Sequence, residues 1–203
     1  MIDPLYFKEL SAQDPADICR RAGCEFDPAG KAFILSFWGD TFRVDPKARS
    51  VVRLNRATMD TRDKSATFLG LLIVFYLLHA REVVPSLEWI SEKDIPGGAT
   101  FFRGPHKIPT DLMEVRYSGD VKAFCRRCVQ LNGSPLDMAD AAYRFTLTPR
   151  LPVAVQFWDG DTEFPPEAKL LFDRTISQHL TPDIIFCLAV VICHRMAPPD
   201  TKD

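Results

Sequence analysis

Two long apolar runs dominate the hydrophobic pattern of this chain. Residues 61–81 are apolar on every face over their centre, which predicts a helix inside the domain rather than on its surface. Residues 183–196 repeat this pattern, and Thr181 followed by Pro182 favours a helix start just before them. The longest apolar run, 68–78, is well below the roughly 20 residues that a membrane-spanning helix needs. We therefore predict two buried helices and no membrane segment.

Shorter patterns in the first part of the chain predict a helix followed by a sheet. Asp14 suits a helix N-cap, Pro15 suits the first helical position, and Gly23 suits the residue after the last turn. Residues 31–37 and 41–44 are strand-like and flank a turn, as a β-meander requires.

The second half of the chain repeats this mixture of helix and strand. Residues 119–131 are amphipathic and predict a helix, whereas 142–148 and 153–158 predict strands. With the two apolar helices, these elements indicate an α+β fold in one domain, an antiparallel or mixed sheet packed on two buried apolar helices. We expect this single domain to cover the whole chain, with an ordered core over about 5–196 and a frayed tail at 197–203.

Composition narrows the class of protein without naming a reaction. The 203 residues are 46% hydrophobic and 26% charged, which is typical of a globular protein. The net charge is −2 and basic residues are interleaved with acidic ones, so we expect no nucleic-acid partner. Six cysteines without a secretory signal favour reduced thiols in the cytoplasm.

The segment 157–173 concentrates carboxylates and is a candidate site. These side chains could supply oxygen ligands for Mg²⁺ or Ca²⁺, or a general acid and base pair. A structural interpretation is also open, because Asp159-Gly160 favours a hairpin turn and Pro165-Pro166-Glu167 is a suitable helix start. The carboxylates are Asp159, Asp161, Glu163, Glu167 and Asp173.

The loop 89–107 is a second candidate site, because it mixes aromatic rings and cations beside two glycines. Rings could stack on a planar ligand while arginine binds its carboxylate or phosphate groups. An ordinary surface loop with buried aromatics would have the same composition. The residues concerned are Trp89, Phe101, Phe102, Arg103, His106 and Lys107.

Cysteine spacing suggests a weaker third candidate. Cys125 and Cys128 form a CxxC pair on a predicted helix, and Cys19 and Cys24 could complete a four-ligand set if the fold brought them close. We favour the interpretation of Cys125 and Cys128 as bystanders.

Three segments carry a resemblance to a known family: EWISEKDIPGGATFF, LNGSPLDMADAAYRF and FPPEAKLLFD. In these, the chain resembles the prokaryotic family called domain of unknown function 3786, over about residues 6–194. The resemblance implies a protein of anaerobic bacteria and archaea, some of whose relatives carry a separate cysteine-rich iron–sulfur module that this sequence lacks. Cys125 and Cys128 depart from the family pattern, which argues against a shared metal role for them.

The sequence therefore predicts a cytoplasmic accessory or binding protein of anaerobic metabolism that takes a small anionic or planar ligand. We place its pocket between the Gly97-Gly98 loop and the segment 159–173. Two alternatives stay open: a metal-assisted enzyme that uses these carboxylates with His106 as proton carrier, and a redox or iron–sulfur partner protein. No particular cofactor or oligomeric state is indicated. The predicted ligand-binding residues are Trp89, Phe101, Arg103, His106, Trp158, Glu163 and Glu167.

Overall fold

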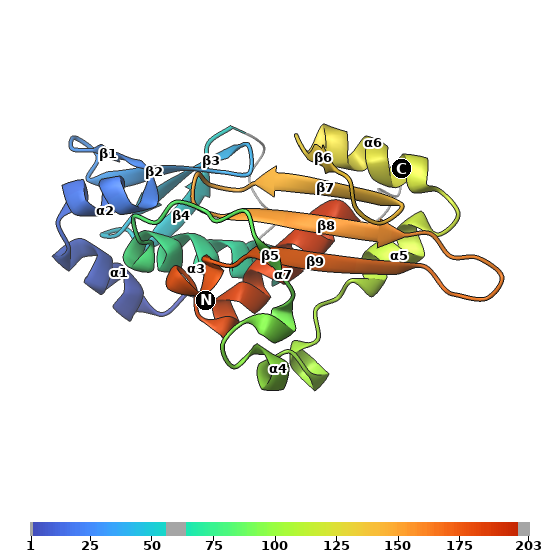
Figure 1. Ribbon diagram of the computed structural model, residues 1–203. Coiled ribbons are helices and arrows are strands. Elements are labelled where there is room, and N and C mark those ends of the chain that lie inside the picture. Colours follow the sequence, from blue (N-terminus) through green and yellow to red (C-terminus); the bar gives the residue numbers. More distant parts are fainter. Residues whose placement is uncertain (1, 56–63, 199–203) are drawn as a thin grey trace.

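The computed structural model describes residues 2–55 and 64–198 and confirms the α+β class (Figure 1). Its helices are α1 (Pro4–Ala12), α2 (Pro15–Ala22), α3 (Lys64–His79), α4 (Gly98–Phe101), α5 (Asp111–Tyr117), α6 (Val121–Gln130) and α7 (Pro182–Met196), with 3₁₀ helices η1 (Glu92–Asp94), η2 (Gly104–His106) and η3 (Ile176–Gln178). Its strands are β1 (Glu25–Asp27), β2 (Ala32–Phe37), β3 (Asp40–Asp45), β4 (Ser50–Arg53), β5 (Trp89–Ile90), β6 (Ser134–Leu136), β7 (Ala141–Thr146), β8 (Pro152–Trp158) and β9 (Glu167–Asp173).

The first sheet is the predicted meander, with antiparallel order β1-β2-β3-β4. Its central hairpin turns at Trp38 and Gly39, whose φ angles of 47° and 77° match the left-handed pair that a tight two-residue hairpin favours. The Trp38 N–H donates to the carbonyl of Leu147 at 2.7 Å, and its indole Nε1 donates to that of Leu131 at 3.2 Å. The turn is therefore fixed to the second half of the chain.

The second sheet is also antiparallel, with order β5-β9-β8-β7-β6. Its strand β9 corrects one expectation, because Pro165-Pro166-Glu167 leads into a strand and not into a helix. Residues in β9 alternate at first between exposed and buried, and Val155 of β8 lies opposite Leu170. Cross-strand pairing and burial of one face thus outweigh a local helix-start signal. The segment 159–166 connects β8 to β9 as a hairpin loop.

The two predicted apolar helices are present, and they pack against each other behind the second sheet in Figure 1. Helix α7 begins at Pro182 as expected, whereas the expected start of the other helix at 61–63 lies outside the described residues. One cluster of buried apolar side chains joins these helices to both sheets. None of the described helices is long and apolar enough to cross a membrane.

Two shorter predicted helices are present: α2 has the predicted boundaries, and α6 covers 121–130 of the predicted 119–131. A further helix, α5, was not predicted. The Asp14 carboxylate accepts from the N–H of Ala16 at 3.2 Å to start α2, and Gly23 ends it with φ 67°. Helix α6 begins after Asp120, whose carboxylate accepts from the N–H of Ala123 at 2.8 Å. Helix α5 has no strong sequence signal, yet it packs against β9 and supplies a residue to the pocket described next.

Candidate functional site

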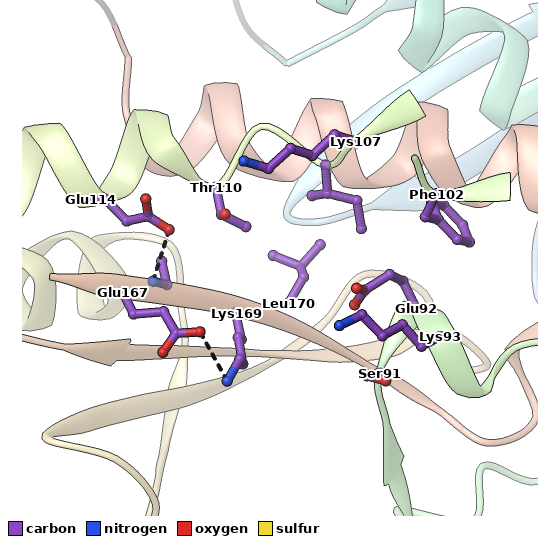
Figure 2. A pocket seen from close by; sticks show the side chains of 12 residues that line it. Ser91, Glu92, Lys93, Phe102, Lys107, Thr110, Glu114, Glu167, Lys169 and Leu170 are labelled. Atoms are coloured by element: carbon purple, nitrogen blue, oxygen red, sulfur yellow. Dashed lines mark hydrogen bonds and ion pairs between the residues drawn. The ribbon is translucent and has the colours of Figure 1, made fainter. Parts of the chain in front are cut away.

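A cavity of about 510 Å³ opens beside β9 at the edge of the second sheet (Figure 2). The helix η1 bounds one end, α5 bounds the other, and the chain between α4 and α5 closes the side that faces β9. We call this cavity the edge pocket. Its lining residues are Ser91, Glu92, Lys93, Phe102, Lys107, Ile108, Thr110, Glu114, Glu167, Ala168, Lys169 and Leu170.

Three lysines and three glutamates surround an apolar centre in the edge pocket. Lys169 Nζ lies 3.0 Å from a Glu167 carboxylate oxygen and 4.9 Å from the centroid of the Trp158 ring, so its charge is already partnered. In the described part of the chain no ion pair joins Lys93 or Lys107 to another side chain. Figure 2 shows Lys107 extending over the cavity toward Thr110, with Lys93 at the opposite end. These two ammonium groups are the available cations of the pocket.

Glu114 ties α5 to the edge of the second sheet. Its carboxylate oxygen Oε1 accepts a hydrogen bond from the backbone N–H of Ala168 at 3.1 Å (Figure 2). Within residues 2–55 and 64–198 no strand pairs with β9 on this side at Ala168, so that N–H has no strand partner there. A side chain from 54 positions earlier thus occupies a backbone donor of the sheet.

A capping arrangement holds η1 in place at the end of the edge pocket. The Ser91 N–H and hydroxyl both donate to the Asp94 carboxylate, at 3.0 and 2.6 Å, and these bonds lower the pKa of Asp94, the hydroxyl contributing most. Gly98 packs against the same turn, since a Cβ built there would lie only 1.9 Å from the carbonyl oxygen of Glu92. The predicted glycine loop therefore positions Glu92 and Lys93 through a close backbone approach.

Of the seven predicted ligand-binding residues, Glu167 lines the edge pocket. Trp158 lies beneath the Lys169 ammonium and so supports the rim. Trp89 forms part of β5, where it lies opposite Asp173. Glu163 is exposed in the hairpin loop before β9.

The remaining three predicted residues, from the aromatic and cationic loop, lie outside the lining of the edge pocket. The His106 ring stacks on Phe101 with centroids 4.4 Å apart and meets Phe186 of α7 edge-on at 5.4 Å. Arg103 is exposed. This stacking anchors the loop on α7, with Phe102 the loop aromatic that lines the cavity.

Nine of the twelve lining residues were not singled out from the sequence, among them the polar residues Lys93, Thr110, Glu114 and Lys169. Lys93 and Lys169 lie inside the two candidate segments, 89–107 and 157–173. Each is a single lysine near acidic residues, so it forms no motif that would indicate a binding site. Thr110 and Glu114 come from the start of α5, which was not predicted. The available signal was the alternation Glu167-Ala168-Lys169-Leu170, which is typical of a half-buried strand.

The carboxylates of the 159–173 segment are engaged in turns and loop contacts. Asp159 accepts from the N–H groups of Gly119 at 2.8 Å and Gly160 at 3.0 Å. Asp161 accepts from the N–H groups of Phe164 and Glu163, at 2.8 and 2.7 Å, and these two bonds lower its pKa.

Asp173 has a similar structural role in a buried position. Burial alone would raise the pKa of its carboxyl, but hydrogen bonds from Thr175, Ser86 and Leu87 outweigh burial and hold the pKa below its usual value. Among residues 2–55 and 64–198 no three His, Cys, Asp or Glu side chains are placed to hold a metal ion. The geometry thus gives the metal-assisted alternative no support there.

The cysteines of the third hypothesis lie on separate elements. Cys19 and Cys24 have thiols 3.7 Å apart at the end of α2, which packs on β1, whereas Cys125 and Cys128 lie on α6, which packs on β7. Burial raises the pKa of the Cys24 and Cys128 thiols, which disfavours the reactive thiolate. In the described residues these four thiols form no group suited to a metal or cluster.

Comparison with known proteins identifies a family. No curated protein and no solved structure matches the chain significantly. One family model matches residues 14–195, a span that includes the edge pocket and all three segments that carry the resemblance. The chain therefore belongs to the family described as "Domain of unknown function (DUF3786)".

Proposed function

We propose that this chain is a binding protein whose edge pocket takes a small organic anion. The observation that supports this best is a cavity of about 510 Å³ lined by two lysines that form no ion pair with any side chain the structure describes. Pockets that hold small ligands typically measure roughly 300–1,000 Å³ and combine apolar walls with a few placed polar groups.

The lining indicates which ligand chemistry fits. Phe102, Ile108 and Leu170 offer apolar surface to a flat or compact body. Lys107 and Lys93 lie at opposite ends of the cavity, and each suits a carboxylate or phosphate group of a ligand. A ligand in this position would lie between the edge of β9 and the chain that connects α4 to α5.

The cellular role belongs to the same proposal. The resemblance implies an accessory role in the metabolism of anaerobes, and the six free cysteines favour the reducing cytoplasm. An iron–sulfur protein is a candidate partner in this setting. We propose that the chain holds or delivers an anionic small molecule there.

The test is titration with a planar anion and its neutral analogue. We expect 1-naphthoate to bind in calorimetry and 1-naphthamide, which has nearly the same body without the charge, to bind about tenfold more weakly. Lys107→Gln and Lys93→Gln should each weaken naphthoate binding by about fivefold. Arg103→Gln is the matched control, because that cation is exposed and lies outside the pocket lining.

Two outcomes would overturn the proposal. One is equal affinity for the acid and the amide, or no binding of either. The other is that Arg103→Gln loses naphthoate binding while Lys107→Gln and Lys93→Gln keep wild-type affinity. This result would place the anion site at Arg103 in the loop.

A further inference from the structure

The edge of β9 is only partly covered by its neighbour. Strand β5 pairs with β9 at two positions, Trp89 opposite Asp173 and Ile90 opposite Phe172. The chain then leaves the sheet at Ser91 and turns into η1. In the described part of the chain no strand continues this pairing alongside residues 167–171. The edge pocket is the space that such a strand would occupy.

Strand geometry shows which backbone groups face this space. Neighbouring residues in a strand direct their N–H and C=O groups to opposite sides, so alternate residues share a side. The Ala168 N–H points away from β8, because it donates to Glu114. The N–H and C=O of Phe172 face the same side, because Arg174, two residues further on, donates its N–H to the carbonyl of Glu88 beside β5 at 2.9 Å. Leu170 lies between them in the same alternation, so its N–H and C=O point into the edge pocket.

We propose that the ligand of the edge pocket is a short extended peptide from a partner protein, which adds to β9 as a strand in line with β5. This inference rests on the proposed function and names its ligand class. Unpaired edge groups bind an added strand through main-chain hydrogen bonds, while side-chain pockets select the sequence. The N–H and C=O of Leu170 would bond one peptide residue.

The walls of the edge pocket define the favoured peptide. Residues that lie opposite each other on two strands point to the same face of the sheet. Figure 2 shows Leu170 pointing toward the side of Lys107 and Thr110, and Lys169 pointing to the other side. A peptide residue opposite Leu170 therefore meets the apolar wall with Phe102 and Ile108. Its neighbours point to the side of Lys169, whose ammonium already contacts Glu167 but has three N–H donors and can bind a second carboxylate from an acidic side chain.

The closing experiment compares two peptides with the same charges. The probe is a capped pentapeptide of alternating aspartate and valine with valines at the second and fourth positions, and its control carries N-methyl groups on both valine amides. We expect the probe to bind in calorimetry and to slow hydrogen exchange at the Leu170 amide by about tenfold. The methylated peptide should bind about tenfold more weakly, because it lacks the donors for β9.

Each outcome separates this inference from the proposed function. If the two peptides bind equally well, or if neither binds, the peptide inference is wrong, and anion binding at the edge pocket stands provided that 1-naphthoate binds. If neither peptide nor naphthoate binds, both are wrong. Tight binding of the probe without protection at Leu170 would also overturn the inference, because the peptide would then lie elsewhere.

Discussion

At the scale of single residues, Glu114 determines whether the Ala168 N–H at the edge of β9 is available to a ligand. Its carboxylate is the acceptor for the Ala168 N–H, and it also places a negative charge at the end of the edge pocket. Glu114→Ala removes both, so the Ala168 amide should lose its partner and exchange its hydrogen about tenfold faster. Amide exchange measured by NMR tests this.

Glu114→Gln is the matched control, because its side-chain oxygen can still accept from Ala168 while the charge is gone. Its Ala168 amide should stay protected. If the Ala168 amide exchanges at the same rate in wild type and in both variants, the hydrogen bond to Glu114 does not protect this amide in solution. Another contact must then protect the edge of β9.

At the scale of elements, the two adjacent glycines at the start of α4 have different structural roles. Gly97 has φ 77° and open space around it, so Gly97→Ala should cost about 1 kcal/mol of stability through backbone strain alone. Gly98→Ala would place a Cβ against the Glu92 carbonyl, which is backbone and must move. We expect this variant to lose about 2 kcal/mol and to bind naphthoate more weakly, because η1 shifts.

Denaturant unfolding and calorimetry on both glycine variants give the measurement. A Gly98→Ala protein with wild-type stability and wild-type naphthoate affinity would contradict the close packing of α4 on η1. Equal loss of affinity in the two variants would mean that general strain in this loop, and not the position of Glu92, controls the site.

The elements that were predictable from the sequence are those whose boundaries depend on local bonds. Asp14 and Gly23 define α2 through contacts within a few residues, and the turn at Trp38 and Gly39 does the same for the first hairpin. Strand β9 was missed because its state depends on pairing with β8, and a proline pair just before it resembles a helix start.

Only the chain segments that form the site were predictable from the sequence, and most of its individual residues were not. The loop 89–107 and the segment 157–173 were both singled out, yet most of the side chains that line the pocket are not the ones predicted. Glu114 reaches Ala168 across 54 positions, and the orientation of Lys107 depends on the path between η2 and α5. No local pattern encodes such contacts, because they follow from how α5 packs on β9.

At the scale of the whole molecule, a buried polar junction near His179 connects the ends of several elements. His179 is 2% exposed, and its Nδ1 accepts from the Arg81 N–H at 3.2 Å just after α3. Arg150 donates to the carbonyls of Arg21 at 2.8 Å and Val83 at 3.2 Å, which joins α2 to the chain beyond α3. Burial, followed by the positive charge of Arg150, lowers the pKa of His179 from 6.5 to about 4, although Asp173 acts in the opposite direction.

This lowered pKa predicts acid sensitivity in a defined window. The folded protein keeps His179 neutral down to about pH 4, whereas the unfolded chain takes up a proton near pH 6.5. The free energy of unfolding should therefore fall as the pH drops from 6.5 to 4, by at most about 3 kcal/mol from this group. Urea unfolding at a series of pH values measures it, and Asp173, with its pKa below 3.8, contributes only under this window.

His179→Asn is the variant that isolates the effect, because its side-chain oxygen can replace Nδ1 as the acceptor for Arg81 while nothing at the site titrates. It should be less stable than wild type at pH 7, where it loses packing, but its stability should change much less between pH 6.5 and 4. The two stability curves must therefore converge toward low pH. Parallel curves would show that His179 is protonated in the folded protein, and the junction between α3, β9 and η3 would then have to accommodate a charge.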